Sequence, residues 1–179
     1  MPYGFTHIIF AWIMGKLYAY FRKLKINIEE WFFLIFGAIF PDVDYLIQWT
    51  TGIPVHRVFT HSLVMVILGF ILCYIIINLY NKYRKENLNT KMIAMFFSFG
   101  ILSHIILDMV VGKPGVPLFW PLDTWFYFFG ILSEPFRSVP YNQRTVEMLS
   151  NLLKWAIFDI GLGALWIFYL IFTKKIKDM

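Results

Sequence analysis

Four histidines and three aspartates are the residues whose types and spacing point to metal chemistry. His104 and Asp108 stand four positions apart in the segment H-I-I-L-D, so a helix presents both side chains on one face. Imidazole and carboxylate groups, with no thiolate among them, suit Zn²⁺ or Mn²⁺. The complete set of candidate metal ligands is His7, Asp42, Asp44, His56, His61, His104 and Asp108.

The number of candidate ligands bears on the number of ions. A single catalytic zinc needs three or four protein ligands, and this set exceeds that number, so one or two ions are expected. Two ions a few ångströms apart would bind a phosphate and activate a water molecule between them. The expected chemistry is therefore hydrolysis of a phosphate ester.

Three aspartates and an arginine have more than one possible role. Arg57 follows His56 and could offer a planar fork to a phosphate, or else contact a headgroup or form a salt bridge with an aspartate. Asp42 or Asp44, whichever does not bind metal, could serve as a catalytic base. Asp159 is either an extra ligand or a polar residue in helix packing.

The composition determines which elements must position these residues. The chain is 59% hydrophobic and 15% charged, with 20 Phe and 7 Trp in 179 residues, and several segments reach the roughly 20 apolar residues that span a bilayer. We expect one integral membrane domain over residues 1–179, an all-α polytopic bundle of about five transmembrane helices. The single cysteine, Cys73, excludes an intrachain disulfide framework or a thiolate metal site.

The expected spans and connections follow from the apolar stretches. Pro41 interrupts the second span, and Thr60 is expected to cap the third. The start of the chain has no basic segment or small-residue cleavage site, so the first apolar stretch is expected to remain in the mature protein. The spans are residues 5–21, 28–49, 60–80, 91–111 and 155–173, with an extracytoplasmic cap at 112–154.

The basic residues orient the bundle. Ten lie after the first and third spans, at the start of the fourth, and in the C-terminal tail: Arg22, Lys23, Lys25, Lys82, Arg84, Lys85, Lys91, Lys174, Lys175 and Lys177. Five lie on the opposite side: Arg57, Lys113, Arg137, Arg144 and Lys154. This asymmetry predicts a multi-pass protein of the cell (inner or plasma) membrane with its N-terminus outside and its C-terminus in the cytoplasm. Because the net charge of +5 is gathered at span ends, no nucleic-acid partner is expected.

That orientation brings the candidate ligands to one depth. At 1.5 Å per helical residue, all of them lie roughly 20–30 Å from the cytoplasmic boundary. Ionisable groups at membrane depth are costly and are usually retained for a function. We therefore expect a metal site at the outer headgroup layer, open to a membrane lipid.

The order of these motifs resembles a known family. His7, P-D-x-D from Pro41 to Asp44, H-R-x-x-T-H-S from His56 to Ser62, H-x-x-x-D from His104 to Asp108, and Trp120-Pro121 resemble the membrane-bound metal-dependent hydrolases described as LexA-binding, inner-membrane-associated putative hydrolases. The resemblance covers roughly residues 1–125. A looser similarity to zinc-dependent phospholipase C and the single-strand nucleases implies phosphoester hydrolysis, although this chain lacks their further H-x-x-x-D ligands.

These observations predict a membrane-embedded metal-dependent hydrolase that cleaves a phosphate ester of a lipid. One alternative is a metal-dependent peptidase or amide hydrolase, although the chain has no H-E-x-x-H helix. Another is a protein that binds or transports a metal without catalysis. Transport would require polar groups that continue toward the cytoplasm, and the inner halves of the spans offer little beyond Lys16 and Asn78.

Overall fold

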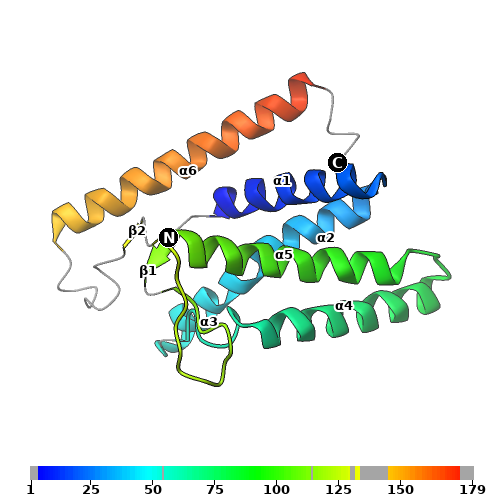
Figure 1. Ribbon diagram of the computed structural model, residues 1–179, viewed down its shortest axis with the longest axis horizontal. Helices are drawn as coiled ribbons and strands as arrows, with labels where there is room; N and C mark the ends of the chain where they lie inside the picture. Colours follow the sequence, from blue (N-terminus) through cyan, green and yellow to red (C-terminus); the bar gives the residue numbers. More distant parts are fainter. Residues whose placement is uncertain (1–3, 54, 114, 130–131, 134–144, 174–179) are drawn as a thin grey trace.

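A computed structural model gives the arrangement of the chain and describes residues 4–53, 55–113, 115–129, 132–133 and 145–173. Figure 1 shows a bundle of long helices in which α5 runs through the middle. The cap segment 134–144, with Arg137 and Arg144, and the basic tail 174–179 lie outside the described residues. The elements are α1 (Gly4–Arg22), α2 (Ile28–Ile39), η1 (Phe40–Val43), α3 (Asp44–Thr51), α4 (Leu63–Arg84), α5 (Thr90–Val111), β1 (Gly112–Lys113), β2 (Leu132–Ser133) and α6 (Val146–Phe172).

The closest helix pair is α2 with α5, and two glycines make it possible. A Cβ on Gly100 would lie 2.2 Å from the Leu34 carbonyl oxygen, and a Cβ on Gly37 would lie 2.2 Å from that of Phe97. Small residues let two backbones approach in this way, as they do in membrane helix pairs. The contact brings the C-terminal end of α2 against the turn of α5 that precedes His104.

The predicted interruption at Pro41 is confirmed. The second apolar stretch divides into α2, the short 3₁₀ turn η1 with Pro41 in its first turn, and the eight-residue α3. Proline has no N–H to continue the hydrogen-bond pattern. The break places Asp42 in η1 and Asp44 at the start of α3.

The third stretch begins later than the sequence indicated. Helix α4 starts at Leu63, and its N-cap is Ser62, whose side chain accepts a hydrogen bond from the Met65 N–H. The assignment of Thr60 as the cap was therefore wrong. The hydroxyl of Thr60 is free to bind elsewhere because Ser62 satisfies the helix end.

The last helix begins earlier than the sequence indicated. Helix α6 starts at Val146, with Thr145 as its N-cap, whereas the span was expected from residue 155. The described part of the cap contains a parallel pairing of β1 with β2 and a bridge between Val116 and Phe126. The last residues of the predicted cap therefore form the first turns of α6.

The all-helical membrane architecture is confirmed, apart from the two-residue strands. Among the described residues, three helices are long and apolar enough to cross a membrane: α4, α5 and α6. The first span, α1, carries Lys16 above the rings of Trp12 and Trp31, and the second is broken at η1. That these two segments also cross the membrane remains a prediction.

Candidate metal centre

The predicted ligands meet at one end of the bundle. The first turn of α1 brings His7, η1 brings Asp42, the segment before α4 brings His61, and the last turns of α5 bring His104 and Asp108. Three overlapping groups have donor atoms within 4.8 Å of one another: His7 with Asp42 and His104, Asp42 with His56 and His61, and His61 with His104 and Asp108.

His104 is oriented by a backbone carbonyl. Its Nδ1 lies 2.7 Å from the Ala38 oxygen, which can only accept, so Nδ1 carries the proton and Nε2 keeps its lone pair. In a 3₁₀ pattern the donor to this oxygen would be residue 41, which is proline. The break at Pro41 thus helps to free the acceptor that fixes the tautomer of His104.

His61 is oriented by Thr60. The Thr60 hydroxyl donates to Asp44 Oδ2 and lies 2.9 Å from His61 Nδ1. Because its single hydrogen is committed to the carboxylate, the hydroxyl oxygen accepts from the Nδ1–H of His61. The lone pair of His61 is consequently also on Nε2, toward His104.

Two imidazole lone pairs and two carboxylates therefore face one point. The Nε2 atoms of His61 and His104 are 3.2 Å apart. Asp42 Oδ1 lies 3.6 Å from each of them, and Asp108 Oδ2 lies 3.5 Å and 3.9 Å from His61 and His104 respectively. Ligand atoms around a tetrahedral zinc are about 3.3 Å apart, given Zn–N and Zn–O bonds near 2.0–2.2 Å.

The donor chemistry fits a divalent cation. Asp42 Oδ1 and Asp108 Oδ1 are buried without a hydrogen-bond partner among the described residues, whereas Asp108 Oδ2 is paired with the Arg57 guanidinium. A shared proton between the two Nε2 atoms would relieve their repulsion but would leave those oxygens unsatisfied, which is costly in a buried site. A metal ion among these four side chains would engage all of them.

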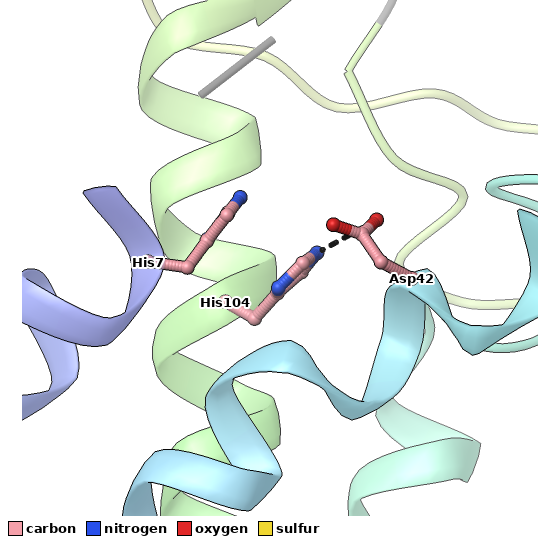
Figure 2. Close-up of side chains that lie close together, drawn as sticks. All are labelled: His7, Asp42 and His104. Atoms are coloured by element: carbon pink, nitrogen blue, oxygen red, sulfur yellow. Dashed lines mark ion pairs between the residues drawn. The ribbon is translucent and has the colours of Figure 1, made fainter. Parts of the chain in front are cut away.

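His7 completes the cluster in a different way. Figure 2 shows its ring beside that of His104, with Asp42 on the far side of His104. The His7 and His104 rings stack with centroids 3.7 Å apart, and His7 Nε2 lies 3.6 Å from Asp108 Oδ1. Neither ring nitrogen of His7 has a hydrogen-bond partner among the described residues. Since one nitrogen of a neutral imidazole carries the proton and the other the lone pair, either nitrogen, but not both, can donate to a metal.

Asp44 lies beside the cluster with both oxygens engaged. Its Oδ1 is 2.7 Å from His56 Nδ1, and its Oδ2 accepts from the Arg57 N–H at 3.1 Å and from Thr60. The His56 ring also stacks on Tyr45, with centroids 3.7 Å apart. The sequence offered Asp44 as a ligand or base, whereas this geometry suits a residue that positions His61 through Thr60.

Arg57 is fully buried against Asp108. Its Nη2 lies 2.9 Å from Asp108 Oδ2, and Nη1 donates to the Gly115 carbonyl at 3.5 Å. The structure therefore contains the salt bridge that the sequence left as one alternative. Its Nε has no hydrogen-bond partner among the described residues, so this N–H keeps donor capacity toward an anion near Asp108.

Asp159 and Trp120 lie outside the donor groups. Asp159 accepts hydrogen bonds from the backbone N–H groups of Phe5 and Thr6 and from the Thr6 hydroxyl, so it binds the start of α1. Trp120 packs edge-on against Phe59. The sequence did not reveal that the Ala38 carbonyl binds His104, because residue types give no signal for a backbone acceptor. It also did not reveal that Thr60 orients His61, although the two residues are adjacent in the chain.

The chain matches a family model described as "YdjM inner membrane protein" over residues 1–176. No curated protein and no solved structure matches it. The chain belongs to the YdjM inner membrane protein family. The resemblance noted from the motifs is thereby confirmed at the level of a membrane-bound family.

Proposed function

We propose that this inner membrane protein is a metal-dependent hydrolase that cleaves a phosphate ester of a lipid. The observation that carries the proposal is the pair of Nε2 atoms of His61 and His104, which lie 3.2 Å apart. A carboxylate oxygen of Asp42 and one of Asp108 lie close to this pair. Each lone pair is aimed by its own hydrogen bond, to Thr60 or to Ala38. Such preorganised donors are typical of metal sites in which a further group hydrogen-bonds to each ligand and fixes its orientation.

His61, His104, Asp42 and Asp108 would hold Zn²⁺ or Mn²⁺, with His7 and His56 close enough to contribute to a second ion. A metal bound there would activate a water molecule and polarise a phosphoryl oxygen. Asp42 would hold the metal through Oδ1 and take the proton of the attacking water on its other oxygen, Oδ2, because Asp44 is already engaged by three donors. Arg57 would direct its Nε–H toward a non-bridging oxygen.

The exposure of the site favours a lipid as the substrate. Asp42 is 27% exposed, whereas the side chains of His61, His104 and Asp108 are 0% exposed. Apolar side chains that surround Asp42 in the chain are themselves exposed: Phe36, Ile39, Val43, Leu46 and Ile47. A phosphate at Asp42 would thus have its acyl or prenyl tail against an apolar surface.

The bundle end that carries the cluster would face outward. The basic residues after α1 and α4 lie at the other end, and positive-inside bias assigns that end to the cytoplasm. The substrate would then be a lipid of the outer leaflet of the inner membrane.

The testing experiment measures metal first and turnover second. Detergent-purified protein is analysed by mass spectrometry for Zn²⁺ and Mn²⁺, then assayed for phosphate release from phospholipids and polyprenyl phosphates. We expect one or two equivalents of metal and release only from substrates with a tail. Arg57→Lys keeps the charge but loses the planar fork, so turnover should fall about tenfold with metal content retained. Arg84→Lys, at the exposed opposite end, is the matched control.

Three results would reject this function. Protein that holds no metal under non-chelating conditions would remove the basis for hydrolysis. Metal-loaded protein that ignores every lipid phosphate but cleaves a peptide or an acyl amide would be an amide hydrolase. Metal uptake into proteoliposomes without any cleavage would indicate transport instead.

A further inference from the structure

Helix α6 carries one buried carboxylate in an otherwise apolar span. Asp159 is 4% exposed and stands in the segment W-A-I-F-D-I-G-L-G. The helix is long and apolar enough to cross a membrane, and most of its surface is unburied. A carboxylate in such a helix is costly and is usually retained for a specific partner.

The partner of Asp159 is the N-terminus of α1. Oδ2 accepts from the Phe5 N–H at 3.0 Å, and Oδ1 accepts from the Thr6 N–H at 2.7 Å and from the Thr6 hydroxyl. The first N–H groups of a helix have no acceptor within the helix and carry partial positive charge. Asp159 therefore caps α1 from another helix.

A second contact fixes the same turn. A Cβ on Gly163, one helical turn beyond Asp159, would lie 2.4 Å from the Phe5 ring. The absence of a side chain at Gly163 lets Phe5 rest against the backbone of α6. Figure 1 shows α6 on the outer side of α1, away from α4, so α6 acts on the site through α1.

His7 follows Phe5 and Thr6 in the chain, and its ring has no hydrogen bond within the described part of the chain to fix its position. The rings of His61 and His104 are each held at Nδ1 by Thr60 and Ala38. Both ring nitrogens of His7 lack a hydrogen-bond partner among the described residues, yet the ring is 1% exposed and stacks on His104. Its position depends on where the backbone of α1 begins.

We propose that Asp159 is a positioning residue for the metal centre, which sets the place of His7 by capping the first turn of α1 from α6. This inference rests on the metal site proposed above. Helix α6 would thus hold the His7 ring in place through α1, without contact between Asp159 and the metal ion.

The test is a double-mutant cycle on the full-length protein in detergent, with Zn²⁺ affinity measured against a competing chelator. Asp159→Asn keeps the size of the side chain but replaces one acceptor oxygen with an NH₂ group. We expect its Zn²⁺ affinity to fall on the order of tenfold, as for other residues that orient a ligand. In a His7→Ala background, Asp159→Asn should cause no further loss. Asp123→Asn, at an exposed aspartate, is the matched control and should leave affinity unchanged.

Thr6→Val provides a milder variant if Asp159→Asn fails to fold. It removes only the hydroxyl hydrogen bond to Asp159 and leaves both backbone bonds in place. A smaller loss of Zn²⁺ affinity is expected, again only when His7 is present.

The outcomes separate this inference from the proposed function. Wild-type affinity in both Asp159→Asn and Thr6→Val, or equal losses with and without His7, would overturn the positioning role while the metal site stands. A wild-type protein that binds neither Zn²⁺ nor Mn²⁺ would overturn the metal site itself. A loss that depends on His7 supports the inference.

Discussion

The two ends of the bundle contain charged residues under opposite conditions. At one end, Lys23 and Lys85 are exposed and end α1 and α4 in left-handed backbone conformations, with φ of 51° and 56°. At the other, Arg57 has a similar φ of 60°, but it is 0% exposed and its N–H binds Asp44. Exposed cations need only water or lipid headgroups. At the buried end, the charged side chains must find their partners within the protein. That requirement gathers them into the candidate metal centre.

The largest expected difference between the two ends is their accessibility from outside the cell. A cysteine at Thr124 lies at the cluster end and one at Asn87 at the basic end, and both positions are exposed. An impermeant maleimide on intact cells should label Thr124→Cys and leave Asn87→Cys unlabelled. The parent protein, whose buried Cys73 should not react, is the control. The reverse pattern would place the site in the cytoplasm.

The next largest effect is expected from removal of Asp108. Asp108→Ala leaves the guanidinium of Arg57 buried without its partner, which should destabilise the protein by about 3–5 kcal/mol. It also removes an oxygen between His61 and His104, so most of the bound metal should be lost. Unfolding in detergent and metal analysis measure both effects. Asp123→Ala, at an exposed position, should change neither, and a stable metal-loaded Asp108→Ala protein would contradict the site.

A smaller effect is expected at the crossing of α2 and α5. Gly100→Ala would push a Cβ against the Leu34 carbonyl, at 2.2 Å before relaxation, and should cost about 1–3 kcal/mol of unfolding free energy. The displaced α5 should also loosen the bond from His104 to Ala38 and weaken metal binding. Gly161→Ala, in open space on α6, is the matched control. Equal stability of the two variants would show that the crossing does not position His104.

The smallest effect is expected at Thr60. Thr60→Val preserves shape but removes the hydroxyl between Asp44 and His61, so the ring of His61 loses its fixed tautomer. Metal affinity should fall on the order of tenfold, with the unfolding midpoint almost unchanged. Thr50→Val, which removes an exposed hydroxyl bonded to its own helix at Leu46, should have no effect on affinity. A Thr60→Val protein with full affinity would indicate that Asp44 does not act through Thr60.

The sequence predicted the elements well where the signal is local. Apolar length located α4, α5 and most of α6, and Pro41 marked the break in the second stretch because proline cannot donate a hydrogen bond. The boundary errors arose where residue types had two uses. Thr60 was taken for the cap because it preceded an apolar run, while Ser62 two residues later performs that role.

The identity of the candidate donors was determined by the sequence alone. Four histidines and three aspartates at matching depths along separate helices can be read from spacing, since rise per residue is fixed. How they divide into ligands and supports was decided by the tertiary structure. Asp42 and Asp44 are two residues apart in one motif, yet one faces the Nε2 pair and the other binds His56, Thr60 and the Arg57 backbone.

The same distinction applies to Asp159 and Ala38. The sequence marked Asp159 as an unusual carboxylate in an apolar span, but its partner lies 153 and 154 positions away at the start of α1. The carbonyl of Ala38 is chemically identical to every other in the chain, and only the close approach at Gly37 and Gly100 brings it to His104. Local patterns specify helices and donor types because they depend on near neighbours. Hydrogen-bond partners between distant helices depend on how those helices pack.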